Sequence, residues 1–307
     1  MSNKMNIYYK YLSHIDEDTF NNPTIRLSVP QHLNDPFESA ACTTFQNKFK
    51  IKSIPEHSII YSTPLIKHTI KFELNKFCII SLSETSRNLL MWSHYANEHR
   101  GICIGYTPDF IKPEDHKTVS SAGYFEPIPV KYDSLRYYDD EQESELTNEE
   151  QLFKILTIKS NEWIYEKEHR CIVPINYADT IKLNNLSEFE ISLLIRAYKD
   201  DLEKEIKNGK YNPLDLERVD LGAGYTLRNY FENKRETVLL KAIPPEKINR
   251  IYFGCRYPVR EILGLISKIK STSHPLHHVK LFRYELDDER FELKENLVYS
   301  PTLNPAL

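Results

Sequence analysis

Glycine is scarce in this sequence. Only 8 of the 307 residues are glycine, and neither a G-x-G-x-x-G nor a G-x-x-x-x-G-K-[ST] string occurs. Glycine-rich loops of these two kinds let the backbone approach phosphate groups closely. Their absence excludes the Rossmann and P-loop classes of nucleotide-binding protein.

Cysteine is sparse as well, and its spacing argues against a fold stabilised by disulfide bonds or by zinc. The five cysteines form no C-x-x-C pair; they are Cys42, Cys78, Cys103, Cys171 and Cys255. An odd number at these spacings supports neither a disulfide framework nor a zinc knuckle. We expect Cys78, Cys103 and Cys171, each within an apolar run, to pack as small buried hydrophobic residues.

Long apolar runs and an excess of one charge are also missing. No run approaches the roughly 18 apolar residues that span a membrane, and the start, MSNKMNIYYKYLS, lacks the apolar core of a signal peptide. We therefore expect a cytoplasmic protein without a membrane partner. The net charge of −4 would repel a polyanion unless basic residues cluster on one face.

Hydrophobic residues make up 40% of the chain and charged residues 27%, which is typical of a globular protein. Short strands and helices follow one another without a βαβ rhythm, so we predict an α+β fold with mixed, mainly antiparallel sheets and flanking helices. The predicted strands are 7–12, 24–29, 77–82, 102–106, 168–175, 237–242, 248–253 and 279–286, and the predicted helices are 88–98, 149–161 and 259–269.

The pattern predicts one elaborated domain over residues 1–296. A helical insertion is expected near 185–235, with its helix at 187–208, and 297–307 is expected to be a loosely ordered tail. Ser86 is expected to cap the helix at 88–98.

The first candidate site is the string from Trp163 to Arg170. In an extended chain the period of two places Glu166, Glu168 and Arg170 on one face, with the two carboxylates about 7 Å apart. One carboxylate can then bind substrate hydroxyls while the other stabilises a developing cation, and Arg170 would orient one of them. The alternative is an exposed strand face carrying surface ion pairs.

The second candidate site combines Ser81-Leu-Ser-Glu84 with Met91-Trp-Ser-His-Tyr95 on the following helix. Strand ends that lead into helices often line pockets. His94 and His99 diverge by about 140° on a helix, so we expect no metal site there. For His94 a buried structural role and a ligand-binding role both stay open.

The third candidate is Asn34-Asp35-Pro36-Phe37-Glu38. Asp35 before a proline favours a turn held by its side chain, with Phe37 as an anchor into the core. Whether Asn34, Asp35 and Glu84 are structural or functional stays open.

At these places the chain resembles the bacterial family catalogued as domain of unknown function 2971. The matching strings are Tyr9-Lys-Tyr11, Asn34-Asp-Pro-Phe37, Ser81-Leu-Ser-Glu84, Leu90-Met-Trp-Ser-His-Tyr-Ala96, His99 with Gly101-Ile-Cys-Ile104, Trp163-Ile-Tyr-Glu-Lys-Glu168 with Arg170, and Ile243-Pro-Pro-Glu-Lys-Ile248 with Ile251-Tyr-Phe-Gly254. The resemblance implies a bacterial protein, of a kind found in mobile and defence-related gene neighbourhoods. It identifies a site but no reaction.

The order of three motifs is also similar, more distantly, to ADP-ribosyltransferases. Those enzymes have an Arg or His on an early strand, a serine-rich middle strand and a Glu-x-Glu motif opening a late strand. The resemblance implies NAD as substrate, Glu168 and Glu166 as catalytic residues, and a binding surface made by Lys10, Ser81, Ser83, Trp92, His94, Tyr95 and Arg170. Lys10 departs from the expected Arg or His, and Ser-Leu-Ser departs from Ser-Thr-Ser.

These resemblances favour an effector or defence-type protein that consumes NAD, with a protein or nucleic acid acceptor left open. One alternative is a non-catalytic domain that senses a ligand, such as a small nucleotide, or binds a partner. Another is a metal-dependent nuclease, for which Asp35, Glu84 and Glu168 are the candidate carboxylates.

Overall fold

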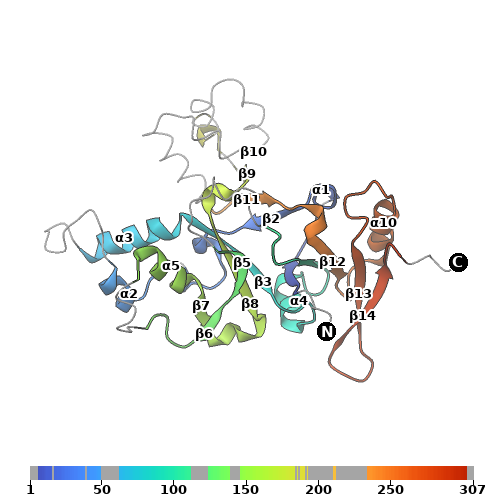
Figure 1. Cartoon of the computed structure of the whole chain (residues 1–307), viewed down its shortest axis with the longest axis horizontal. Coiled ribbons are helices and arrows are strands. Elements are labelled where there is room, and N and C mark those ends of the chain that lie inside the picture. The colour runs from blue at the N-terminus through green and yellow to red at the C-terminus, as the bar shows by residue number, and fades with distance from the viewer. Residues whose placement is uncertain are drawn as a thin grey trace.

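The computed structural model describes residues 6–15, 17–38, 40–49, 62–111, 124–138, 146–183, 185, 187–190, 192, 210–211 and 234–302. An eight-stranded sheet runs through the centre of the molecule, in the order β14-β13-β12-β4-β1-β3-β8-β5 (Figure 1). Its strands are β1 (Tyr8–Leu12), β3 (Phe77–Ser83), β4 (Ile102–Tyr106), β5 (Tyr124–Pro129), β8 (Glu168–Pro174), β12 (Ile248–Phe253), β13 (Lys280–Leu286) and β14 (Leu293–Tyr299). All neighbours in it are antiparallel except β12 and β13.

Two smaller sheets accompany it. The four-stranded sheet has the order β10 (Lys210–Tyr211), β9 (Thr180–Leu183), β11 (Thr237–Ala242), β2 (Thr24–Leu27), and the parallel pair is β6 (Lys131–Asp133) with β7 (Ile158–Ser160). The helices are α1 (Glu17–Asn21), α2 (Thr43–Lys48), α3 (Thr63–Leu74), α4 (Leu89–Tyr95), α5 (Asn148–Leu156) and α10 (Val259–Ile269), with short 3-10 turns η1 (Pro30–His32), η3 (Asn161–Glu166), η4 (Ile175–Tyr177) and η6 (Pro245–Lys247). The predicted α+β class is confirmed.

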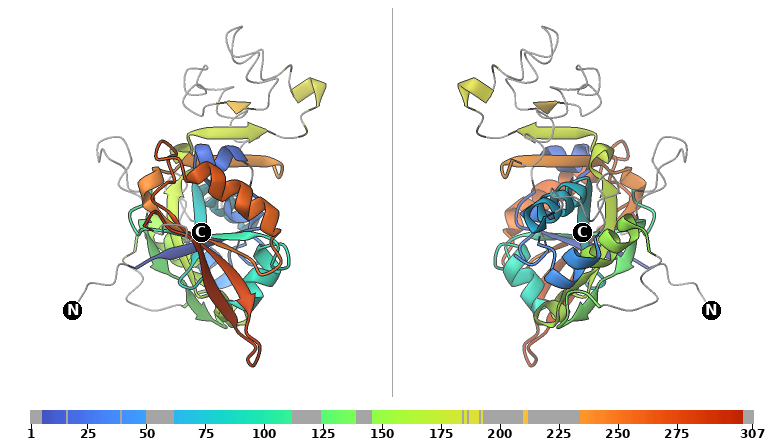
Figure 2. Two further views of the ribbon diagram at one scale, coloured as in Figure 1. Left: turned by 90° about the vertical axis from the view of Figure 1, so that its right-hand side faces the viewer. Right: turned by 90° about the vertical axis from the view of Figure 1, so that its left-hand side faces the viewer.

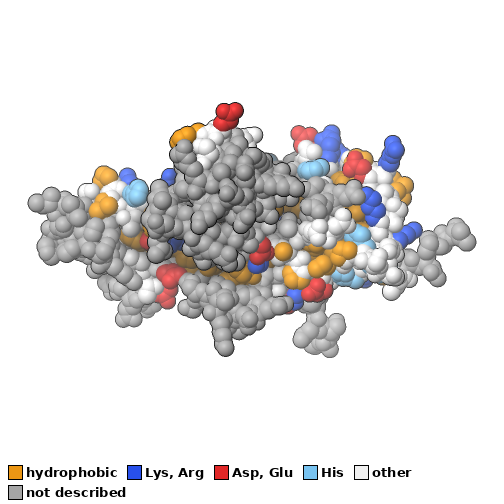
Figure 3. Space-filling view, turned by 90° about the horizontal axis from the view of Figure 1, so that it is seen from above, with side chains coloured by type: hydrophobic (Ala, Val, Ile, Leu, Met, Phe, Trp, Pro, Cys, Tyr) orange, Lys and Arg blue, Asp and Glu red, His pale blue; other side chains and the backbone are white. Residues whose placement is uncertain are grey.

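Two groups of elements lie at opposite ends of the molecule. α2, α3 and α5 gather at one end, while α10 and the β13–β14 hairpin lie at the other (Figures 1 and 2). Seen from above, acidic and basic side chains of the described residues are interspersed rather than gathered by sign (Figure 3).

The apolar core follows from the alternation of side chains along the central strands. On β3, Cys78, Ile80 and Leu82 join the largest buried cluster, which also contains residues of the four-stranded sheet and of α10. On the opposite face Phe77 and Ile79 pack with α2, α3 and α5. A third cluster surrounds Trp92 of α4 and fills the far part of that same side. The cysteines Cys78, Cys103 and Cys171 are buried, as predicted.

Several predicted boundaries differ from the structure. The helix predicted at 149–161 ends at Leu156, and the chain turns into β7 and then η3. Ser86 does not cap α4; the Asn88 side chain does, by accepting from the backbone N–H groups of Leu90 and Met91. β14 continues to Tyr299, into the stretch predicted to be a loose tail. The predicted helical insertion near 185–235 lies largely outside the described residues.

Candidate functional site

The candidate site lies where two neighbouring strands of the central sheet separate. The register of β1 with β3 is limited to Tyr9 opposite Ser83, and further along β3 the backbone of Ile79 bonds Ser28 instead. Between these two points the Ser81 carbonyl oxygen accepts a hydrogen bond of 2.8 Å from Lys10 Nζ. A cavity of about 260 Å³ opens at this separation.

Strands β3 and β8 supply the polar side chains on one face of the sheet. Ser81 lies opposite Arg170 and Ser83 lies opposite Glu168. Cross-strand partners point to the same face, so these four side chains share it. Leu82, the residue between the serines, is 2% exposed and packs in the core on the other face.

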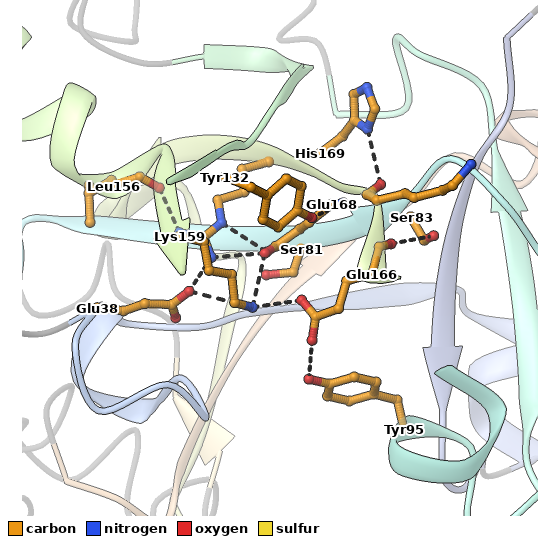
Figure 4. Close-up of polar contacts among 12 residues, drawn as sticks. Glu38, Ser81, Ser83, Tyr95, Tyr132, Leu156, Lys159, Glu166, Glu168 and His169 are labelled. Atoms are coloured by element: carbon orange, nitrogen blue, oxygen red, sulfur yellow. Dashed lines mark hydrogen bonds and ion pairs between the residues drawn. The ribbon is translucent and has the colours of Figure 1, made fainter. Parts of the chain in front are cut away.

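A buried ammonium group holds three carboxylates together (Figure 4). Lys159 Nζ lies 2.6 Å from Glu166 Oε2, 3.2 Å from Glu168 Oε2 and 3.6 Å from Glu38 Oε1. The four side chains are at most 6% exposed. A cation enclosed by carboxylates in this way takes the place that a metal ion has in many acidic sites.

A buried guanidinium completes the network. Arg170 Nε and Nη2 donate to the two oxygens of Glu168 at 2.8 and 2.9 Å, and Nη2 also pairs with Glu38. Arg170 Nη1 donates to the Leu156 carbonyl at the end of α5, at 2.6 Å. Bidentate contacts of this kind are strong and fix the direction of both partners. Glu168 is therefore held in one orientation.

Neighbouring hydroxyl groups fix the chain around Glu166 and Glu168. Tyr95 of α4 donates its phenolic hydrogen to Glu166 Oε1 at 2.5 Å, and Ser83 Oγ donates to the Glu166 carbonyl at 2.8 Å. The Glu168 backbone N–H donates to Tyr132 Oη at 2.7 Å. Figure 4 shows the contacts of Tyr95 and Ser83 with Glu166.

Burial and charge separate the proton affinities of the two carboxyl groups that share Arg170. Burial disfavours the ionised form of Glu168, but Arg170 and Lys159 outweigh it and lower the pKa of that carboxyl to about 2. For Glu38 burial dominates and raises the pKa, against the pull of Arg170 and Lys159. Burial also lowers the pKa of the Lys10 ammonium to about 8.

The extended conformation predicted for Glu166 to Arg170 is present only from Glu168 onward. Glu166 ends the 3-10 turn η3, and Lys167 then adopts the left-handed conformation with a φ of 47°. This turn, rather than strand alternation, brings Glu166 to the same side as Glu168. The alternative of an exposed ladder of surface ion pairs is wrong, because both glutamates are buried.

Most of the residues predicted for the site do meet. Lys10, Ser81, Ser83, Tyr95, Glu166 and Glu168 all line the cavity, and Arg170 lies behind Glu168. The described lining does not include Trp92, which is fully buried and donates from its indole N–H to the Ser86 carbonyl at 2.8 Å. Nor does it include His94, which is exposed.

The turn residues divide between the two roles left open. Asn34 lines the cavity, whereas the Asp35 carboxylate accepts from the Phe37 backbone N–H at 2.9 Å and holds the turn. The prediction that Phe37 anchors the turn in the core is wrong, because that side chain is 59% exposed. Glu84 is exposed and pairs with Lys167 at 3.0 Å.

Sequence reasoning missed Lys159 and gave Glu38 no role beyond the turn. Lys159 stands in a stretch predicted as helix, and nothing in its local pattern indicates a buried cation. Glu38 and Lys159 also line a second cavity of about 320 Å³, whose other lining residues include Phe37, Asp133, Arg136 and Ile158. Among the described residues, Glu38 is the only carboxylate residue that lines both cavities.

The described residues offer neither a metal-ligand cluster nor a membrane-spanning helix. In that part of the chain no group of three His, Cys, Asp or Glu side chains is arranged to hold a metal ion. The nuclease alternative therefore gains no support from Asp35, Glu84 and Glu168. No helix there is long and apolar enough to cross a membrane.

One family model matches part of the chain. Residues 91–171 match the model of the family described as a protein of unknown function (DUF2971). The DUF2971 match includes the Trp-Ser-His-Tyr-Ala string and the whole Glu166 to Arg170 string, so it covers most of α4 and two of the three glutamates of the site. The resemblance to DUF2971 predicted from the motifs is confirmed, whereas these comparisons do not support the more distant resemblance to ADP-ribosyltransferases. No curated protein and no solved structure matches the chain.

Proposed function

We propose that this cavity binds the nicotinamide ribose half of NAD and that the protein cleaves the bond between the nicotinamide and the ribose. The observation that carries the proposal is the convergence of Lys10, Ser81 and Glu168, from three different strands, on one cavity. These are the positions that the distant resemblance to ADP-ribosyltransferases names. The volume of about 260 Å³ lies just below the usual range of ligand pockets and suits half of a dinucleotide.

The charges around the cavity suit such a ligand. Lys10, Arg26 and His32 lie on the lining together with the three glutamates Glu38, Glu166 and Glu168. NAD carries a pyrophosphate, which favours the basic groups, and a cationic nicotinamide ring, which favours the carboxylates. A ligand with both charges is better matched to this lining than a plain anion.

The two departures from the ADP-ribosyltransferase pattern are compatible with this role. Lys10 keeps the positive charge expected on the early strand, although it offers no planar fork to a phosphate. The leucine in Ser-Leu-Ser faces the core, so the two serines still point together to the face of Glu168. A Ser81 side-chain hydrogen bond also helps to stabilise the ionised form of Glu168.

The chemistry requires a fixed negative charge at the ribose. When the glycosidic bond breaks, its electron pair leaves with nicotinamide, and positive charge develops on the ribose ring. Glu168 stays ionised, because its pKa is lowered to about 2. A carboxylate oriented before the reaction stabilises such a cation without reorganisation. Water or an acceptor then attacks the anomeric carbon and loses a proton.

The test is release of nicotinamide from labelled NAD, with water and with candidate protein and RNA acceptors. Glu168→Gln should lower the rate by about 10² to 10³-fold, the range found when one electrostatic stabiliser is removed. Ser81→Ala should lower it less, since it removes a supporting hydroxyl. Glu73→Gln, on the surface of α3, is the matched control. Undiminished turnover in a folded Glu168→Gln, or no turnover in the wild type, would defeat the proposal.

The effector role follows from the same activity. A protein that consumes NAD inside a bacterial cell would act as a toxin or as an anti-phage defence protein. Expression of the wild type should therefore arrest growth and deplete NAD, whereas Glu168→Gln at equal abundance should do neither. Growth arrest by both proteins alike would argue against an effector that acts through NAD.

One observation favours a second candidate, a pocket that binds a ligand without turning it over. Both carboxylate oxygens of Glu168 already accept hydrogen bonds from Arg170 or Lys159. A ribose hydroxyl would have to share or displace one of them. This candidate predicts that a nucleotide stabilises the protein against thermal unfolding while no nicotinamide is released.

A further inference from the structure

We propose that Glu38, rather than Glu166, is the group that takes the proton from the acceptor, and that the acceptor approaches through the second cavity. The inference rests on the proposed function above. Its basis is that Glu38 lines both cavities and belongs to a buried group in which three carboxylates face two close cations.

Position is the first argument. Glu38 lines both the cavity that contains Glu168 and the one lined by Phe37, Arg136 and Ile158. Glu166 and Glu168 line only the first of these. A base that serves a nucleophile entering from one cavity toward a ribose in the other must reach both. Among the three glutamates, Glu38 has that position.

The second argument is the pattern of hydrogen bonds. Both oxygens of Glu166 are engaged, one by Tyr95 and the other by Lys159. Both oxygens of Glu168 accept from Arg170. Glu38 meets Arg170 and Lys159 through Oε1. Among the described residues neither cation contacts its Oε2, so this oxygen can face an acceptor.

The third argument is charge. Glu38, Glu166 and Glu168 are packed around two cations, Lys159 and Arg170, so one negative charge is in excess in a buried place. Such an excess raises the pKa of one of the carboxyl groups and so makes it a stronger base. Lys10, also on the lining, has a pKa lowered to about 8 by burial and is mostly protonated near neutral pH, but its ammonium donates to the Ser81 carbonyl rather than to one of these carboxylates.

Glu38 is also the stronger base of the two carboxylates that share Arg170. Its pKa is raised by burial, whereas that of Glu168 is lowered to about 2, where Arg170 and Lys159 outweigh burial. Two carboxyl groups with separated pKa values in one site commonly divide acid–base and electrostatic roles. Tyr95 keeps its own proton, since burial and its bond to Glu166 raise its pKa.

The step balances as follows. The acceptor X–H attacks the anomeric carbon, the bond from that carbon to nicotinamide breaks, and its electron pair leaves with nicotinamide. The carboxylate of Glu38 takes the proton from X–H and later releases it to water. The products are ADP-ribosyl–X, nicotinamide and one proton.

The experiment compares the pH dependence of kcat/KM for nicotinamide release in the wild type, Glu38→Gln, Glu38→Asp and Glu166→Gln. Glu38→Gln should lose about 10² to 10⁴-fold, the usual contribution of a general base, and its rate should no longer fall toward acid pH. Glu38→Asp should keep that acid limb at a lower rate. Thermal unfolding confirms that each variant is folded.

The outcomes separate this inference from the proposed function. If folded Glu38→Gln turns over as fast as the wild type and its rate still falls toward acid pH, Glu38 is not the base. That result leaves the proposed function standing. If instead the rate of Glu166→Gln no longer falls toward acid pH, Glu166 takes the proton, and the role of Glu38 is again overturned. Absence of turnover in the wild type removes the proposed function and this step together.

Blocking the second cavity tests the route of the acceptor. Ser134 is exposed on the lining of that cavity and is absent from the lining of the first. Ser134→Trp should lower transfer to a macromolecular acceptor at least tenfold and change release of nicotinamide to water by less. Equal transfer by this variant and the wild type would overturn the proposed route.

Discussion

Single residues in this protein owe their charge state to burial and to a few close partners. Glu168 keeps its negative charge because two cations bind it, although the site is nearly closed to water. Glu38, with the same two cations, has a raised pKa. The contrast shows that distance to a cation alone does not set the proton affinity of a buried carboxyl.

A pH prediction follows at this scale. The pKa of Glu168 in the folded protein, about 2, is below the unfolded value of about 4.3. Its contribution is therefore fully present above about pH 4.3 and is lost as the pH falls toward 2. The loss should be of the order of 3 kcal/mol, at 1.36 kcal/mol per pKa unit.

Urea unfolding between pH 5 and 2 measures this contribution. Glu168→Gln should be less stable at pH 5, by about 3–5 kcal/mol, since it leaves Arg170 with one carboxylate fewer. The free energy of unfolding of the variant should then fall less steeply toward acid pH than that of the wild type. Parallel curves would contradict the assigned pKa.

Among the elements, α4 and the turn after it show the structural role of Trp92. Trp92 lies fully buried between Tyr11 and Tyr284, with ring centroids 5.3 and 5.5 Å away. After α4 the chain passes through three consecutive left-handed residues, Asn97 to His99. The His99 carbonyl then accepts from the Arg256 backbone N–H at 3.1 Å. The turn thereby fixes the end of β12 against α4.

This close packing predicts the effect of a single methyl group. A Cβ at Gly254 would lie 2.0 Å from the His99 backbone oxygen, whereas a Cβ at Gly264 in α10 would meet nothing within 4 Å. Gly254→Ala should lower the free energy of unfolding by about 1–3 kcal/mol or more, as overpacking does. Gly264→Ala should raise it by about 0.5–1 kcal/mol. Thermal denaturation of the two variants, side by side, checks both signs; equal stabilities would contradict the geometry.

Much of the element pattern was predictable from the sequence, because apolar alternation and β-branched runs are local signals. The strands at 102–106, 237–242 and 248–253 and the helix at 259–269 were predicted with the observed bounds. The site was predictable only in part. Lys10, Ser81 and Glu168 stood in recognisable motifs, but the burial of Lys159 depends on an unexpected turn after Leu156 and on Glu38, which is far away in the sequence.

For the whole molecule, the decisive property is that the cavity is formed where two halves of the central sheet separate. One half carries Lys10 and the other carries Ser81 and Glu168. A ligand held by all three connects the halves and stabilises the folded state by its binding free energy. Binding should therefore be visible as a change in global stability.

This predicts the response to a non-hydrolysable NAD analogue. At about 100 times its Kd the analogue should raise the free energy of unfolding by about 2.7 kcal/mol, and the affinity should fall as the pH rises past about 8, where the pKa of Lys10 lies. Lys10→Met should reduce the shift, whereas Lys76→Met, on the surface beside Glu73, should not. An equal rise in Tm for both variants would exclude Lys10 from the binding site.

The contact between Glu38 and Arg170 joins positions 132 residues apart in the sequence. Closing so long a loop is entropically costly, and contacts of this separation form after local helices and hairpins. We therefore expect the ion network to assemble late in folding. Substitutions at Glu38 or Arg170 should then mainly accelerate unfolding and leave the folding rate nearly unchanged. The lifetime of the folded state, more than the speed of reaching it, would depend on the charges of the site.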